Sequence, residues 1–174
     1  MTNNNHLKAS NLIAYILHKL GGKCDYMKML KLMYFIDFEN YYRYKKPITD
    51  ETYYNQKYGP VANYSYSELF EAGANDNLFK NDLTTKTISE PNQDFDPNFT
   101  IRDIQLIDEI LFKYSKLSGY ELSILSHNDE PWMITVNGEK IEFDYVFERD
   151  GSIEDDGELF STEESISTKN KIMN

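Results

Sequence analysis

The chain has 174 residues, a mass of 20.5 kDa and a formal net charge of −11 at pH 7, with 40% hydrophobic and 14% aromatic residues. This length suits one domain with one packed core, since a chain of this size buries about 70% of its unfolded surface. The acidic balance argues against a nucleic-acid partner, because phosphate contacts need basic surface. The single cysteine, Cys24, excludes an intrachain disulfide and a cysteine-based zinc site.

The charge is unevenly distributed along the chain. Residues 1–63 hold nine Lys/Arg and five Asp/Glu, whereas residues 64–174 hold nine Lys/Arg and 24 Asp/Glu. We expect one domain over residues 1–148 and an acidic, mobile tail over residues 149–174. No apolar run approaches the ~20 residues of a membrane span, and residues 1–10 lack a signal-peptide core. These features predict a cytoplasmic protein without a membrane partner.

Two helices are predicted first along the chain. Between residues 7 and 20, apolar residues recur at three- and four-residue spacings, which predicts an amphipathic helix ended by Gly21-Gly22. Asp25 is the predicted N-cap of a second helix that runs to about Tyr44. Apolar residues occupy nearly all sides of this second helix, which predicts that it lies buried at the centre of the fold.

The middle of the chain favours strands. Residues 52–61 predict an extended segment that Gly59-Pro60 breaks. A short helix is expected to begin at Ser65 or Ser67 and to stop at Gly73. Residues 83–89 are rich in β-branched side chains and predict a second strand.

Two capping boxes predict two further helices. Thr100 and Asp103 form the first box, and Ser118 and Glu121 form the second. Each box places a hydroxyl three residues before a carboxylate, so that both side chains satisfy backbone N–H groups at a helix start. The later helix is expected to end at residues 130–132.

A β-hairpin is predicted after the last helix. Asn137-Gly138 tolerates the positive φ angles of a tight turn, so strands are expected over residues 134–136 and 140–147. The predicted fold class is therefore α+β and mainly helical: a compact helical domain with a small β-sheet or hairpin component.

Catalytic and cofactor motifs are missing from the sequence. It has no glycine-rich phosphate loop with a lysine, no GxGxxG and no HExxH. His18 near the end of a helix favours a dipole interaction over a metal-ligand role. Residues 126–129 contain the residue types of a Ser/His/Asp triad around His127, but adjacent residues cannot point at one another in a relay. We therefore assign no catalytic, cofactor-binding or metal-binding residue, and expect no enzyme activity.

Three weaker patterns fall short of a functional site. Cys24 lies near a helix N-terminus, where thiolates are stabilised, but no base or second thiol accompanies it, so a structural role is favoured. Acidic residues 154–158 lack the spacing of a calcium loop. Two helices joined by Gly21-Gly22 suggest a helix-turn-helix, but the second helix is too apolar to lie in a DNA groove.

Three sequence blocks resemble a known family. Residues 29–37, MLKLMYFID, resemble the "kLhKLlYfad" signature of Panacea-domain proteins, the SocA-like antitoxins. Residues 57–61, KYGPV, resemble the "kyGPV" segment of that family. Residues 107–132 resemble its ending, with LSGYEL, Ser-His and Pro-Trp in the family order. The resemblance covers about residues 7–132, and the segment that follows departs from it.

The resemblance implies a protein that neutralises a co-encoded toxin by direct contact. It also implies a possible second role as an adaptor that delivers the toxin to a ClpXP-type protease, and an origin in prophages or other mobile elements. The motif residues that it marks as partner-binding are Lys31, Tyr34, Tyr58, Gly59, Pro60, His127 and Trp132. The alternative role of these residues is to hold the domain together, with Gly59-Pro60 as a bend and Trp132 as a lid on the core.

An inhibitor needs a binding surface, and tyrosines are suited to one. Seven tyrosines lie between residues 34 and 58, of which two or three are expected to contact the partner and the others to be core. Two other classes remain open. A transcriptional regulator of a mobile element predicts a basic face. A hydrolase predicts a pocket with a perturbed acid or base beside His127.

Overall fold

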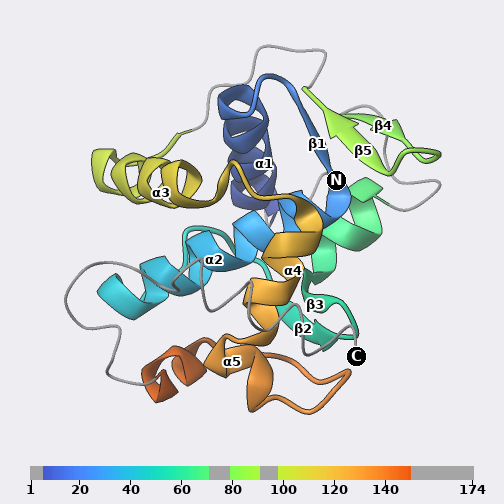
Figure 1. The fold of residues 1–174 in the computed structure, drawn as a ribbon. Coiled ribbons are helices and arrows are strands. Elements are labelled where there is room, and N and C mark those ends of the chain that lie inside the picture. Colours follow the sequence, from blue (N-terminus) through green and yellow to red (C-terminus); the bar gives the residue numbers. More distant parts are fainter. Residues whose placement is uncertain (1–5, 71–78, 91–97, 150–174) are drawn as a thin grey trace.

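The computed structural model describes residues 6–70, 79–90 and 98–149 (Figure 1). The α-helices in these ranges are α1 (Leu7–Lys19), α2 (Tyr26–Tyr44), α3 (Ile101–Tyr114), α4 (Gly119–His127) and α5 (Glu130–Met133). A π-helical turn, η2, spans Ser65–Phe70, and a 3-10 helix, η3, spans Phe143–Glu148. The strands are β1 (Lys23–Asp25), β2 (Tyr53–Gln56), β3 (Gly59–Ala62), β4 (Lys80–Asp82) and β5 (Thr87–Ser89). The α+β, mainly helical class is confirmed.

Helix α2 is the centre of the fold. It packs against α3, α4, β3 and η3, and 13 of its 19 residues are buried. In Figure 1, α1 and α3 lie above α2, while β2, β3 and α5 lie below it. The Asp25 carboxylate accepts a hydrogen bond from Lys28 N at 2.8 Å, so the predicted N-cap is confirmed. Helix α2 is buried on nearly all sides because its own apolar residues occupy nearly all of its faces.

Both predicted capping boxes are present. Thr100 with Asp103 starts α3, and Ser118 with Glu121 starts α4. Helix α4 ends at His127, and residues 130–133 form the separate short helix α5, with a proline in its first turn. The expected end at residues 130–132 was therefore slightly late, because Pro131 begins a new turn of helix.

The strands differ in part from expectation. Residues 53–62 form an antiparallel hairpin of β2 and β3, and Gly59-Pro60 begins β3. The prediction that Gly59-Pro60 breaks a single extended segment was therefore incomplete. Only residues 87–89 of the expected strand 83–89 are β5, which pairs with β1 on one side and β4 on the other. Residues 83–86 form the β4–β5 turn.

The predicted hairpin around Asn137-Gly138 was wrong. Gly138 does adopt a φ of +85°, as a turn glycine would. The flanking segments, however, do not pair with each other. Asn55 N donates to Glu139 O at 2.9 Å and Ile141 N donates to Tyr53 O at 2.8 Å, so the chain runs along the free edge of β2. Phe143 in η3 then packs on Phe38, because burying aromatic rings against α2 outweighs a local strand preference.

Residues 150–174, most of the expected tail, lie outside the described ranges, as does part of the short helix expected over residues 65–73. Among the helices that the structure describes, none combines the length and apolar character needed to cross a membrane.

Candidate partner-binding site

The β2–β3 turn, taken as residues 57–60 and so including the first two residues of β3, is held by side chains from α2 and α4. Three of its backbone carbonyls have a side-chain partner. His127 Nε2 lies 3.0 Å from Lys57 O, Ser123 Oγ donates to Tyr58 O at 2.7 Å, and Lys31 Nζ donates to Pro60 O at 2.7 Å. The motif residues Lys31, Tyr58, Gly59, Pro60 and His127, which are distant in sequence, are thus brought together at one turn.

Gly59 is required by this close approach. It adopts a φ of +99°, which residues with a Cβ rarely tolerate. A Cβ at this position would clash with Ser126 Oγ and would lie 2.9 Å from Lys31 Cε. The turn can therefore sit against α4 only because residue 59 has no side chain.

His127 is tied to two backbone carbonyls. Its Nδ1 lies 2.5 Å from Ser123 O, and its Nε2 lies near Lys57 O. Both partners are acceptors, so a neutral imidazole donates to one of them and an imidazolium donates to both. The ring also packs edge-on against Trp132, with centroids 4.2 Å apart. The role of His127 in this geometry is to link α4 to the turn.

The residues of the sequence-adjacent triad point to different partners. Ser126 Oγ donates to Ser123 O, while Asp129 accepts from Tyr34 OH at 2.7 Å. Arg149 donates to both Asp129 oxygens, at 2.8 and 2.9 Å. No relay among Ser126, His127 and Asp129 is formed. The triad that these adjacent residue types suggest is therefore not assembled.

Tyr34 belongs to a buried polar network. Its ring is fully buried, and burial raises the pKa of its hydroxyl well above the usual value. Arg149, which balances the buried Asp129, was not anticipated, because nothing in the sequence around it marks it as buried. Asn55 and Ser123 were also missed as supports of the site. Asn55 Nδ2 donates to the carbonyls of Trp132 and Thr135, at 2.9 and 2.7 Å.

Lys31 is buried and has no acidic partner among the described residues. Its exposed fraction is 2%, and its hydrogen bond within the described ranges is to the neutral carbonyl of Pro60. Burial lowers the pKa of its ammonium group to about 7. By contrast, Arg149 is paired with two carboxylates, Asp129 and Glu39. A buried lysine held by one carbonyl keeps donors available for a further acceptor.

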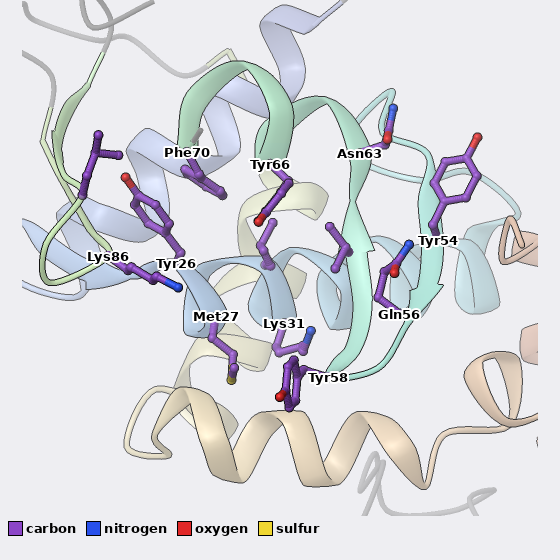
Figure 2. A pocket seen from close by; sticks show the side chains of 13 residues that line it. Tyr26, Met27, Lys31, Tyr54, Gln56, Tyr58, Asn63, Tyr66, Phe70 and Lys86 are labelled. Carbon is purple, nitrogen blue, oxygen red and sulfur yellow. The ribbon is translucent and has the colours of Figure 1, made fainter. Parts of the chain in front are cut away.

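A groove of about 790 Å³ opens beside the turn. It lies between the start of α2, the β2–β3 hairpin, η2 and the β4–β5 turn. Figure 2 shows Tyr26, Phe70 and Lys86 at one end, Tyr54, Gln56 and Asn63 at the other, and Lys31 with Tyr58 between them. Its described lining holds five aromatic residues and two lysines but no Asp or Glu. This volume falls in the range of ligand-binding pockets.

The seven tyrosines between residues 34 and 58 divide by burial. Tyr34 and Tyr53 are core residues, whereas Tyr58 is 60% exposed. Tyr54 and Tyr58 line the groove, and Tyr42 and Tyr44 are partly exposed outside it. That two or three tyrosines contact a partner stays a prediction, and Tyr54 and Tyr58 are the members placed at the groove.

Cys24 is buried, and desolvation raises the pKa of its thiol to about 12. The thiol is therefore protonated at neutral pH, which supports a structural role over an activated thiolate. Within the described ranges, no three His, Cys, Asp or Glu residues gather in a way that could hold a metal ion.

A family model described as Antitoxin SocA-like, Panacea domain matches residues 29–133. This match covers more than half of the chain, so the protein belongs to the SocA-like, Panacea-domain family of antitoxins. The match begins in α2 just before Lys31 and ends with α5, and it contains all seven motif residues. No curated protein and no solved structure was found to match the chain.

Proposed function

We propose that the protein neutralises a co-encoded toxin by binding it directly, with the groove and Tyr58 as the contact face. The observation that carries this proposal is the β2–β3 turn, residues 57–60, whose backbone is fixed by side chains of α2 and α4. It presents an exposed tyrosine at the edge of a groove while three of its carbonyls are held by α2 and α4. Family membership supports an antitoxin-like role, and the geometry of the turn and groove supports this face as the point of contact.

An exposed aromatic side chain on a fixed backbone is well suited to a protein–protein interface. Aromatic side chains dominate binding energy at protein interfaces when they enter a partner's pocket. Rigid presentation lowers the entropy lost on association, because the turn is already ordered before the partner arrives. Tyr58 combines these properties, since its backbone is held while its ring remains 60% exposed.

Co-expression with the product of a neighbouring gene that is toxic on its own tests the proposal. Wild-type protein should restore growth, and Tyr58→Ala should lose most of the rescue. Phe112→Ala is the matched control, because Phe112 is an 89% exposed aromatic residue on α3 that does not line the groove. Full rescue by a folded Tyr58→Ala variant would show that the toxin binds to a different face of the protein. Failure of wild type against every neighbouring gene product would refute neutralisation.

The family resemblance also implies delivery of the bound toxin to a ClpXP-type protease. We propose this adaptor role as a second step that follows binding. A pulse-chase experiment on the toxin should show faster loss when both this protein and the protease are present. Equal toxin lifetimes with and without the protease would leave direct neutralisation as the whole mechanism.

A further inference from the structure

We propose that the groove recognises a carboxylate side chain on an apolar segment of the partner, and that Lys31 is the residue that binds this carboxylate. The inference rests on the proposed toxin-binding role of the groove and names the chemistry that it selects. The occupant is an extended peptide segment with a central Asp or Glu between apolar residues.

Charge complementarity is the first support. The chain has a net charge of −11, yet the described lining of the groove contains Lys31 and Lys86 and no acidic residue. The described lining is therefore locally basic, although the described ranges as a whole hold 16 Lys/Arg against 18 Asp/Glu. Among the described lining residues, a carboxylate meets two lysines and no like charge, whereas a cationic side chain gains no opposite charge.

The coordination of Lys31 is the second support. A charge buried in a protein is normally paired with an opposite charge, as Arg149 is with Asp129. Lys31 has only the Pro60 carbonyl as a hydrogen-bond partner in the described ranges, although an ammonium group has three donors. An incoming carboxylate supplies the missing counter-ion and accepts the donors that remain.

The depth of Lys31 selects a side chain as the source of the carboxylate. With an exposed fraction of 2%, its amine lies at the floor of the groove, against Gly59 and beside Tyr58. A Glu or Asp side chain is narrow enough to reach this depth while the peptide backbone stays at the aromatic rim. A chain terminus would have to bring its backbone down with it.

Proton uptake follows from this arrangement. Because burial lowers the pKa of Lys31 to about 7, most of the population is neutral at pH 8, and pairing with a carboxylate restores the charged form. The other titratable groups that line the groove are Lys86 and the phenols of Tyr26, Tyr54, Tyr58 and Tyr66. Lys31 is the group expected to take up the proton, because its amine is buried at the point where the carboxylate binds.

The test uses the full chain and pooled, end-capped pentapeptides with mixed apolar flanks. One pool has a fixed central Glu, the second has a central Gln, and the third has the Gln centre with a free C-terminal carboxylate. Calorimetry at pH 8 in two buffers of different ionisation enthalpy measures affinity and proton uptake together. The Glu pool should bind about tenfold more tightly than the Gln pool, which is the difference expected between charged and neutral hydrogen bonds. It should also take up protons.

Equal binding of the Glu and Gln pools, or Glu binding without proton uptake, would overturn the proposal. Tighter binding of the free-terminus pool than of the Glu pool would overturn the assignment to a side chain. Lys31→Met should abolish the Glu preference, whereas Lys140→Met, at an exposed lysine that does not line the groove, should retain it. The wild-type measurements decide the matter even if Lys31→Met does not fold. Because the peptide experiment uses no toxin, its failure would not affect the outcome of the toxin-rescue experiment, and the two failures can be told apart.

Discussion

Gly59 is the residue at which the turn and α4 come closest. Gly59→Ala would place a methyl group against Ser126 and Lys31 at a φ of +99°. We expect it to lower the free energy of unfolding by about 2–4 kcal/mol, from backbone strain and overpacking together. Urea denaturation measures this loss, provided that the dependence of the free energy of unfolding on urea concentration is the same in both proteins.

Gly138→Ala is the matched control for Gly59→Ala. Gly138 also has a positive φ, +85°, but nothing lies within 4 Å of the position that a Cβ would occupy. The expected loss is therefore about 1 kcal/mol, from backbone conformation alone. Similar losses at both glycines would show that the contact with α4 contributes little.

Lys31 makes stability depend on pH. Its folded pKa of about 7 lies below the value of 10.5 for a free lysine, so the unfolded chain binds more protons than the folded chain above pH 7. The free energy of unfolding should therefore rise with pH between about 7.5 and 8.5, by at most about 1.4 kcal/mol per unit. Lys31→Met should lack this rise, which urea denaturation at several pH values would detect. Parallel pH profiles for the two proteins would contradict the burial of an ionisable lysine.

The β2–β3 hairpin depends on two helices that are distant in sequence. Removing one link to the turn, by Ser123→Ala or His127→Ala, should cost about 1 kcal/mol. It should also speed hydrogen exchange at the amides of β2 and β3, because local opening becomes easier. Thr85→Ala, which removes an exposed hydroxyl contact next to β5, should leave exchange in β2 and β3 unchanged. Unchanged exchange in both helix variants would mean that the turn is held by other contacts.

Local signals predicted the helices well. Asp25 and the two capping boxes act through neighbours three residues away, so their effect can be recognised in the sequence. The Asn137-Gly138 hairpin failed because the partner of that segment is the edge of β2, some 80 residues earlier in the chain, and local turn preference does not determine a distant pairing.

The candidate site was predictable only in part. The family blocks marked Lys31, Tyr58, Gly59 and His127, and the structure places them at one turn. The missing counter-ion of Lys31 and the sign of the groove could not be predicted. The counter-ion of Lys31 and the charge of the groove both depend on which side chains the tertiary fold brings to the groove lining.

Charge at the scale of the whole molecule is concentrated outside the described ranges. Within those ranges, 16 Lys/Arg nearly balance 18 Asp/Glu, whereas residues 150–174 contain seven Asp/Glu and two Lys. If the proposed toxin has a basic surface, long-range attraction to it therefore depends strongly on the acidic segment 150–174. Such attraction acts mainly on the rate of association.

Deleting residues 150–174 should slow association with a basic toxin and leave dissociation nearly unchanged. The difference between full-length and shortened protein should shrink as salt is raised, because the Debye length falls. Surface plasmon resonance over a salt series separates the two rates. A faster dissociation of the shortened protein at every salt concentration would show that the segment contacts the toxin directly.

The central claim is that Tyr58 and its groove bind the toxin. The most direct measurement is the equilibrium dissociation constant of the purified complex for wild type, Tyr58→Ala and Phe112→Ala, with folding checked by circular dichroism. A buried aromatic anchor is worth about 2 kcal/mol or more, so Tyr58→Ala should weaken binding by roughly 30-fold while Phe112→Ala binds as wild type. Unchanged affinity of a folded Tyr58→Ala variant would contradict the account.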